Sequence, residues 1–236
     1  MVYLAVATSI TTLIERARRR ADMVGSKFVS DTEITDYINQ ALAELYDELI
    51  QAHGEDTFRK SADLTLDDNG EAALPIDWMR TLRVEWSYGQ VVYSLAPADF
   101  RGQARWGIKR AWSPTEPPRY AVRLYTGGDG TDVGWLCLYP TPYTSQTVTL
   151  WYIPVAPVLS SILEETNNYN PLGYDEILVL GAVIRMLAKE ESPTADVVAE
   201  QQRQLDRIRA RAVDDRGLPP RVSDLGGWGV PVRGLW

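Results

Sequence analysis

The chain has 236 residues, of which 45% are hydrophobic and 24% are charged, and its formal net charge at pH 7 is -8. A chain of this size can bury a large core, either as one domain or as a small domain with an insertion. The negative charge argues against tight, general binding to nucleic acid, because phosphate contacts need clustered lysine and arginine.

The N-terminal quarter of the chain is predicted to form two amphipathic helices, over residues 8–23 and 30–50. In both stretches, apolar residues recur at the three- and four-residue spacing of a helical face. Ser30 followed by Glu33 fits a capping box, and Gly54 supplies a stop. Because the link between the helices is short, we expect them to pack as a hairpin. The apolar residues 1–7 are too few, and lack the basic flank, for a secretory signal.

From residue 57 to about residue 157, strand signals replace the helical spacing. Short runs of alternating apolar residues are separated by turn sequences such as 67–70 and 127–130. Pro97 to Gly102 is predicted to form a single helical turn. Strands of this length and spacing are typical of a small antiparallel sandwich or barrel.

Helical signals resume after a polar stretch at residues 164–170. Residues 175–188 are apolar nearly all round, which predicts a helix buried among others, although the run is too short to span a bilayer. Ser192 and Pro193 are predicted to begin the last helix, as its N-cap and first residue, and the helix is expected to end near Gly217.

This order of elements predicts an α+β protein. We expect a four-helix bundle made from an N-terminal and a C-terminal helix pair, with an inserted antiparallel β module and an extended C-terminal tail. The segments are the N-terminal helical hairpin (1–56), the β-rich insertion (57–165), the C-terminal helices (166–216) and the tail (217–236).

The tail is punctuated by glycine and proline and has no overall period, yet it is rich in apolar residues. Such a segment is expected to dock, either on its own subunit or on a neighbouring chain. The candidate docking residues are Leu225, Trp228, Val230, Leu235 and Trp236.

Recognisable catalytic and metal-binding patterns are missing from the sequence. The single histidine, His53, and the single cysteine, Cys137, are too few for the usual zinc or iron sites and for a disulfide. Residues 127–130 lack the lysine and following helix of a phosphate loop, and residues 67–70 lack the closing glutamate of a calcium loop. We therefore expect no enzymatic activity, cofactor or metal. A carboxylate-based hydrolase is supported only by generic acidity.

Arginine clusters on two of the predicted helices. One interpretation is a basic contact face for an acidic partner or DNA; the other, which we favour, is that these side chains are solvated or paired with acids. The residues of this possible face are Arg18, Arg19, Arg20, Arg207 and Arg211.

Seven short motifs follow one another in a defined order: Arg18–Asp22, Phe28–Ile34, Tyr37–Asn39, Ala43–Tyr46, Leu74–Trp78, Leu138–Pro142 and Leu150–Pro154. In this order they resemble the head-to-tail adaptor (connector) proteins of tailed bacteriophages. The resemblance implies a structural virion protein made in the host cytoplasm and located in the virion neck. It implies a ring of identical subunits, typically a dodecamer, that extends the DNA channel below the portal. The implied partners are other copies of the chain, the portal protein, a tail or nozzle protein, and genomic DNA that passes without specific binding.

The aromatic residues of the β insertion leave an alternative function open. Exposed tryptophan rings can stack on sugars or peptides, so the insertion could be a carbohydrate- or peptide-binding module. The residues of this alternative are Trp106, Trp112, Trp135 and Trp151.

Overall fold

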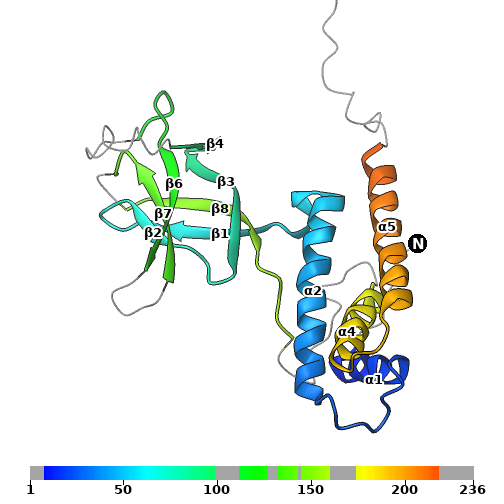
Figure 1. Ribbon diagram of the computed structural model, residues 1–236. Helices are drawn as coiled ribbons and strands as arrows, with labels where there is room; N and C mark the ends of the chain where they lie inside the picture. Colours follow the sequence, from blue (N-terminus) through cyan, green and yellow to red (C-terminus); the bar gives the residue numbers. More distant parts are fainter. Residues whose placement is uncertain (1–7, 99–111, 127–131, 143–144, 160–173, 218–236) are drawn as a thin grey trace, which may run out of the picture. The chain divides into compact units, whose positions relative to one another are not determined.

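The computed structural model describes residues 8–98, 112–126, 132–142, 145–159 and 174–217. The chain divides into two units (Figure 1). One unit, the helical unit, combines residues 1–54 with residues 156–236. The other, the β unit, is the continuous stretch 55–155. The α+β class is therefore confirmed, with helices from both ends of the chain and strands from its middle.

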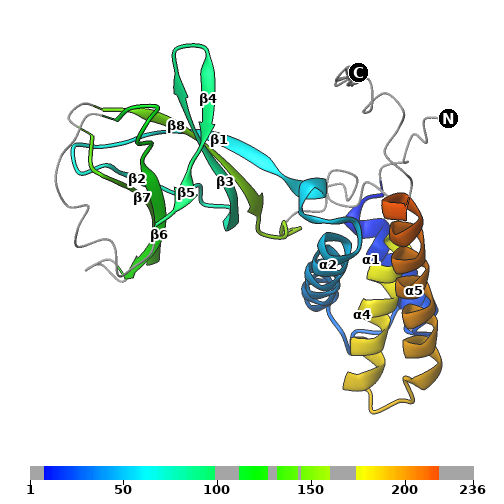
Figure 2. The ribbon, with the colours of Figure 1, turned by 90° about the horizontal axis from the view of Figure 1, so that it is seen from above.

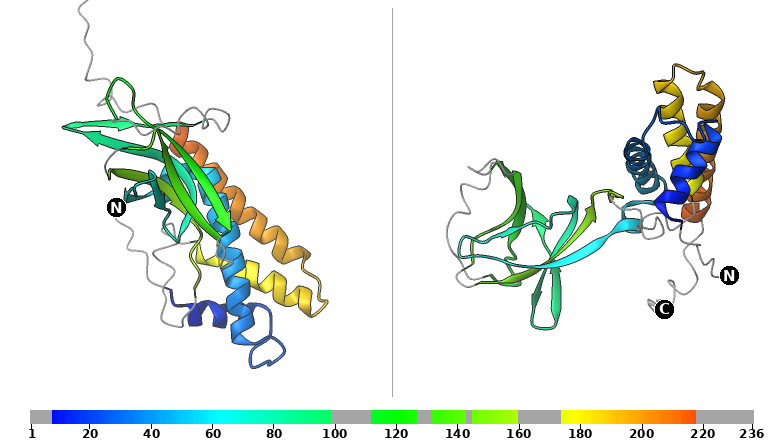
Figure 3. Two further views of the ribbon diagram at one scale, coloured as in Figure 1. Left: turned by 90° about the vertical axis from the view of Figure 1, so that its left-hand side faces the viewer. Right: turned by 90° about the horizontal axis from the view of Figure 1, so that it is seen from below.

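Four α-helices make up the described part of the helical unit: α1 (Ile10–Arg20), α2 (Asp31–His53), α4 (Asp175–Lys189) and α5 (Ala195–Gly217). Helix α4 contacts each of the other three, and the views from different sides agree on its central place (Figures 1 and 3). Every residue from Ile177 to Val183 on α4 is buried. This confirms the prediction of a helix that is apolar nearly all round and buried among others.

Helix α2 begins and ends where residues at its two ends cap it. Ser30 Oγ accepts a hydrogen bond from the Glu33 amide at 3.2 Å. Val29, just before the cap, and Ile34, one turn into the helix, are both fully buried, as expected for a hydrophobic staple. At the other end Gly54 has a φ of 96°, a positive value that glycine adopts without strain, and the chain leaves the helix there.

The β unit is a sandwich of two four-stranded sheets. Their strand orders are β1-β8-β3-β4 and β2-β7-β6-β5, and all the pairs are antiparallel except β5 with β6. The one 3-10 helix and the strands described here are η1 (Glu55–Phe58), β1 (Lys60–Thr65), β2 (Glu71–Ala73), β3 (Trp78–Tyr88), β4 (Val91–Ser94), β5 (Ala96–Pro97), β6 (Arg119–Thr126), β7 (Asp132–Tyr139) and β8 (Thr147–Pro154).

The core of the β unit lies between the two sheets. Alternate residues of β3 and β8 point into it, as the period of a half-buried strand requires. Its buried members are Leu66, Ala72, Val84, Trp86, Leu95, Trp112, Leu136, Leu138, Val148, Leu150 and Tyr152. These residues all come from the stretch 55–155, so this core is independent of the helical unit.

Two local predictions are wrong. Helix α5 begins at Ala195, because the Val198 amide closes the first turn on the carbonyl of Thr194 at 3.0 Å, which places the cap at Thr194. The hydroxyl of Ser192, predicted to cap the helix, instead donates to Glu190. Pro97 does not open a helical turn; it is the second residue of strand β5. The rest of that predicted turn, residues 99–102, lies outside the described residues.

Candidate functional site

Arg18, a member of the predicted basic face, fastens the link between α1 and α2. Its guanidinium donates to the Asp31 carboxylate at 2.7 Å, to the Ser26 carbonyl at 2.8 Å and to the Val29 carbonyl at 2.7 Å. Its side chain is only 17% exposed. A guanidinium held by three oxygens of its own subunit acts first as a structural clamp.

Arg20 joins three helices of the same unit. It donates to Glu176 on α4 and to Glu200 on α5, both at 2.5 Å. The hydrogen bond that Arg20 donates to Glu200 is the main cause that raises the pKa of Arg20 above its ordinary value. Because Glu176 and Glu200 lie far from Arg20 in the sequence, this contact could not be predicted from the sequence pattern.

The other three residues of the predicted basic face are exposed. Arg19 pairs with Glu15 at 3.2 Å, and Arg207 donates to the side-chain oxygen of Gln204 at 3.4 Å. Arg211 is also exposed. Contact of these guanidinium groups with a partner stays a prediction.

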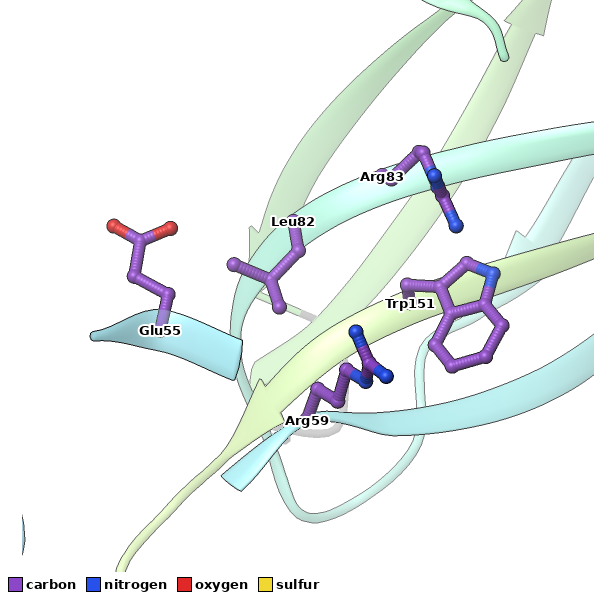
Figure 4. Close-up of a pocket in the computed structure, with 5 residues that line it drawn as sticks. All are labelled: Glu55, Arg59, Leu82, Arg83 and Trp151. Atoms are coloured by element: carbon purple, nitrogen blue, oxygen red, sulfur yellow. The ribbon is translucent and has the colours of Figure 1, made fainter. Parts of the chain in front are cut away.

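On the outer face of the first sheet, two arginines lie over one tryptophan ring (Figure 4). The Cζ atoms of Arg59 and Arg83 are 5.7 Å and 5.6 Å from the centre of the Trp151 ring. These distances suit cation–π contacts. The hollow beside the ring has a volume of about 400 Å³ and is also lined by Glu55 and Leu82.

An irregularity of β3 brings Arg83 to this ring. The register with β8 shifts between Thr81 and Arg83, so Leu82 is an extra residue and Arg83 comes opposite Trp151. Glu85 then holds both side chains, because it accepts from Trp151 Nε1 at 2.7 Å and pairs with Arg83 at 2.8 Å. The two guanidinium groups, the indole ring and the nearby carboxylates make this part of the sheet a polar surface.

The tryptophans of the alternative ligand-binding function are not gathered into one site among the described residues. Trp112 is a core residue: its Nε1 donates to the Pro140 carbonyl at 2.7 Å, and its ring packs edge-on against Trp86. Trp135 is half-buried, Trp151 lies under the two arginines, and Trp106 lies outside the described residues.

The single histidine and the single cysteine belong to different units. His53 ends α2 in the helical unit, whereas Cys137 is buried in β7 of the β unit. Burial is the main cause that raises the pKa of the Cys137 thiol to about 12, so the thiol is neutral near pH 7. Within the described ranges, no group of three or more histidine, cysteine or acidic side chains could hold a metal ion. Among the helices that the structure describes, none is long and apolar enough to cross a membrane.

Sequence reasoning missed an exposed apolar surface at the β3–β4 hairpin, which projects from the sandwich (Figure 2). Tyr88 and Val91 are each 53% exposed and Val92 is 57% exposed. A signal for this surface was present, because two consecutive valines in one strand cannot both face the core. Strand β4 is also the last strand of its sheet.

The candidate docking residues of the tail, from Leu225 to Trp236, lie outside the described residues. Their role stays a prediction.

Comparison with known proteins gives one family match. A family model described as SU10 adaptor protein matches residues 8–224 and thus spans both units. The match contains all seven motifs on which the resemblance to phage adaptors rests. No curated protein matches the chain significantly.

Proposed function

The chain belongs to the SU10 adaptor protein family, whose members are structural, non-enzymatic proteins of the phage virion, and from this premise we propose that it forms the adaptor ring between portal and tail. The observation that carries the proposal is the family match over residues 8–224. The ring is a dodecamer below the portal, in the virion neck, and its lower side receives a tail or nozzle protein.

Two chemically different units in one subunit support a ring. A ring closes through a head-to-tail interface in which each subunit offers two different faces. The helical unit offers helix surfaces lined with ion pairs, whereas the β unit offers a polar sheet face around Trp151 and an apolar hairpin. Because these surfaces differ in chemistry, one subunit can offer two different faces to its neighbours, as a ring requires.

The charge of the chain supports a role in DNA passage. A ring of subunits with a net charge of -8 each presents an acidic environment to genomic DNA. Repulsion between carboxylates and phosphates keeps the passage free of tight contacts, so the genome moves through the channel without specific binding.

The tail provides the attachment. Residues 217–236 carry Leu225, Trp228, Val230, Leu235 and Trp236, which dock on the portal or on an adjacent subunit. The two tryptophans are the strongest candidates among them, because buried tryptophan is often a main source of affinity in protein interfaces.

Truncation after Gly217 tests this proposal. Cosedimentation with purified portal rings from the same phage measures attachment of the full chain and of the truncated chain, with thermal unfolding as the control for folding. We expect the full chain to attach, and the truncated chain to attach weakly while unfolding at the same temperature. Undiminished attachment of the truncated chain would remove the tail from the proposal, and failure of the full chain to attach would overturn the adaptor function.

A further inference from the structure

Among the strands that the structure describes, β4 is a short edge strand of four residues. It pairs with β3 on one side and is the last strand in the order β1-β8-β3-β4. Its residues, Val91 to Ser94, include no charged side chain and no proline, and its register with β3 runs without a shift. Proteins normally blunt such edges with short strands, charges, prolines or bulges, because an open apolar edge recruits further strands, and of these devices β4 uses only its shortness. An edge left open in this way is expected to be covered in the assembled protein.

The backbone groups of β4 that face the open edge can be assigned. The Leu95 amide, just after β4, donates to the Val84 carbonyl on β3 at 2.8 Å. Backbone groups alternate sides along a strand, so the amides of Tyr93 and Val91 also face β3. The amides and carbonyls of Val92 and Ser94 therefore face away from the sheet, beside the exposed side chains of Val91 and Val92.

The tail contains a short stretch that suits this edge. Residues 225–232 carry no charge, and within them Trp228, Val230 and Val232 alternate with Gly229 and Pro231. In an added strand, Pro231 has no amide to donate and must face outward. The three apolar residues then have their amides toward β4 and their side chains on one face.

We infer that residues 228–232 of one copy add to β4 of a neighbouring copy as a fifth strand of its sheet. This inference rests on the proposed ring, and it identifies β4 of the neighbouring subunit as the place where each subunit's tail binds. Main-chain hydrogen bonds to Val92 and Ser94 supply the pairing, and the alternating tryptophan and valines extend the apolar surface of the hairpin.

Symmetry favours the tail over a second β4 as the occupant. Pairing of β4 with β4 would be isologous and would close a dimer, whereas a ring needs two different surfaces at each contact. The tail starts from Gly217 at the end of α5. Residues 218–227 can span roughly 33 Å when extended, about the width of a small domain, so the pairing segment can leave its own subunit.

Binding of a labelled peptide tests the inference without the portal. The probe is a synthetic peptide of residues 222–236, titrated into the chain truncated after Gly217 and followed by fluorescence anisotropy. We expect saturable binding. Val92→Pro in the acceptor removes an amide that faces the open edge and breaks no hydrogen bond between β3 and β4, and we expect it to weaken binding about tenfold. Val92→Thr is the matched control, because it keeps the amide and a β-branched side chain, and it should bind as the unsubstituted chain does.

A second pair of variants is made in the peptide, so that the acceptor chain keeps its original sequence and fold. Val230→Pro removes an amide that faces β4 and should weaken binding, whereas Gly229→Pro removes one that faces outward and should not. Absence of binding, or equal binding of these two peptides, would overturn the assignment.

Further results distinguish pairing with a neighbouring copy from pairing within one copy, and failure of the strand pairing from failure of the adaptor function. If the truncated chain binds the peptide but the full-length chain is monomeric and does not bind it, the tail occupies β4 of its own subunit. That result would overturn the assignment to a neighbouring copy. Portal attachment by the full chain together with no peptide binding overturns the strand pairing alone. Failure of the full chain to attach to portal rings would overturn the adaptor function itself.

Discussion

At the scale of single residues, Asp77 connects three segments of the β unit. Its carboxylate accepts from Lys60 Nζ at 2.8 Å and from the Tyr152 hydroxyl at 2.9 Å, and its carbonyl accepts from the Val155 amide at 2.7 Å. Burial on its own would raise the pKa of Asp77, but the hydrogen bonds from Lys60 and Tyr152 outweigh it and the pKa is lowered. The charged form is therefore the one that the fold stabilises.

Replacement of Asp77 by asparagine should destabilise the chain in a pH-dependent way. We expect Asp77→Asn to lower the free energy of unfolding by about 1 kcal/mol near neutral pH, the usual value of a hydrogen bond to a polar partner. Because the folded pKa lies below the unfolded one, the carboxylate's contribution is present above the unfolded pKa and is lost as pH falls through the folded pKa. Urea titrations of both chains at about pH 7 and about pH 2 measure this. An equal difference at both pH values would contradict it.

Cys137 should be inert in the native chain. It is buried, and its pKa is raised to about 12, first by burial and then by the charge of Glu71. Since the thiolate is the reactive form, we expect a thiol reagent at about pH 8 to label the native chain slowly and the chain in denaturant quickly. Rapid, stoichiometric labelling of the native chain would contradict the burial of this side chain.

The arginines show what could be predicted at this scale. The sequence shows that Arg18 and Arg20 crowd the end of α1, and pairing with acids was the favoured interpretation. Their partners could not be named, because Glu176 and Glu200 meet Arg20 only after α4 and α5 have packed. The same holds for Arg83 and Trp151, which meet through an irregularity of β3 that leaves no signal in the sequence.

At the scale of elements, helices α2 and α4 approach each other closely at Gly181. A Cβ atom added to Gly181 on α4 would lie 2.6 Å from the Cβ of Ala41 on α2. Neither atom can rotate away, since both are attached directly to backbone. The absence of a side chain at Gly181 therefore sets how closely α4 can approach α2.

Gly181→Ala should loosen this helix pair. We expect it to lower the free energy of unfolding by about 1–2 kcal/mol, because the overpacking outweighs the gain in helix propensity. Urea unfolding measures the change. The double variant Ala41→Gly/Gly181→Ala moves the methyl group to the other helix and should recover most of the loss. A single variant that is as stable as the original chain would contradict this packing.

Elements with strong local signals were predictable. The caps of α2, the all-round apolar pattern of α4 and the alternation along β3 and β8 each follow from neighbouring residues. The start of α5 was misplaced because Ser192-Pro193 imitates a helix start two residues before Thr194, which makes the cap. The open edge at β4 could not be predicted, because strand order depends on pairing between distant segments.

At the scale of the whole molecule, the β unit is one continuous stretch and the helical unit is made from both ends of the chain. All buried residues of the sandwich core come from residues 55–155. In contrast, α2 packs against α4 and α5, which follow the β unit in sequence. We propose from this that the β unit, residues 55–155, is a separately folding domain.

Expression of fragments tests the domain proposal. We expect the fragment 55–155 to unfold in a single cooperative transition, because it brings its own core. The fragment 1–54 should not fold, since it exposes the apolar face of α2 without α4. Circular dichroism during thermal unfolding distinguishes the two. A non-cooperative transition of the fragment 55–155 would mean that the β unit needs the helical unit in order to fold, and would contradict the domain proposal.

The mass of the complex with the portal tests the central claim most directly. Native mass measurement of the purified chain mixed with portal rings from the same phage reports how many copies attach. The adaptor function predicts one full ring of this chain on each portal, a dodecamer on a twelve-fold portal, with no intermediate occupancy at saturation. Portal rings that keep their original mass at every concentration of the chain would contradict it.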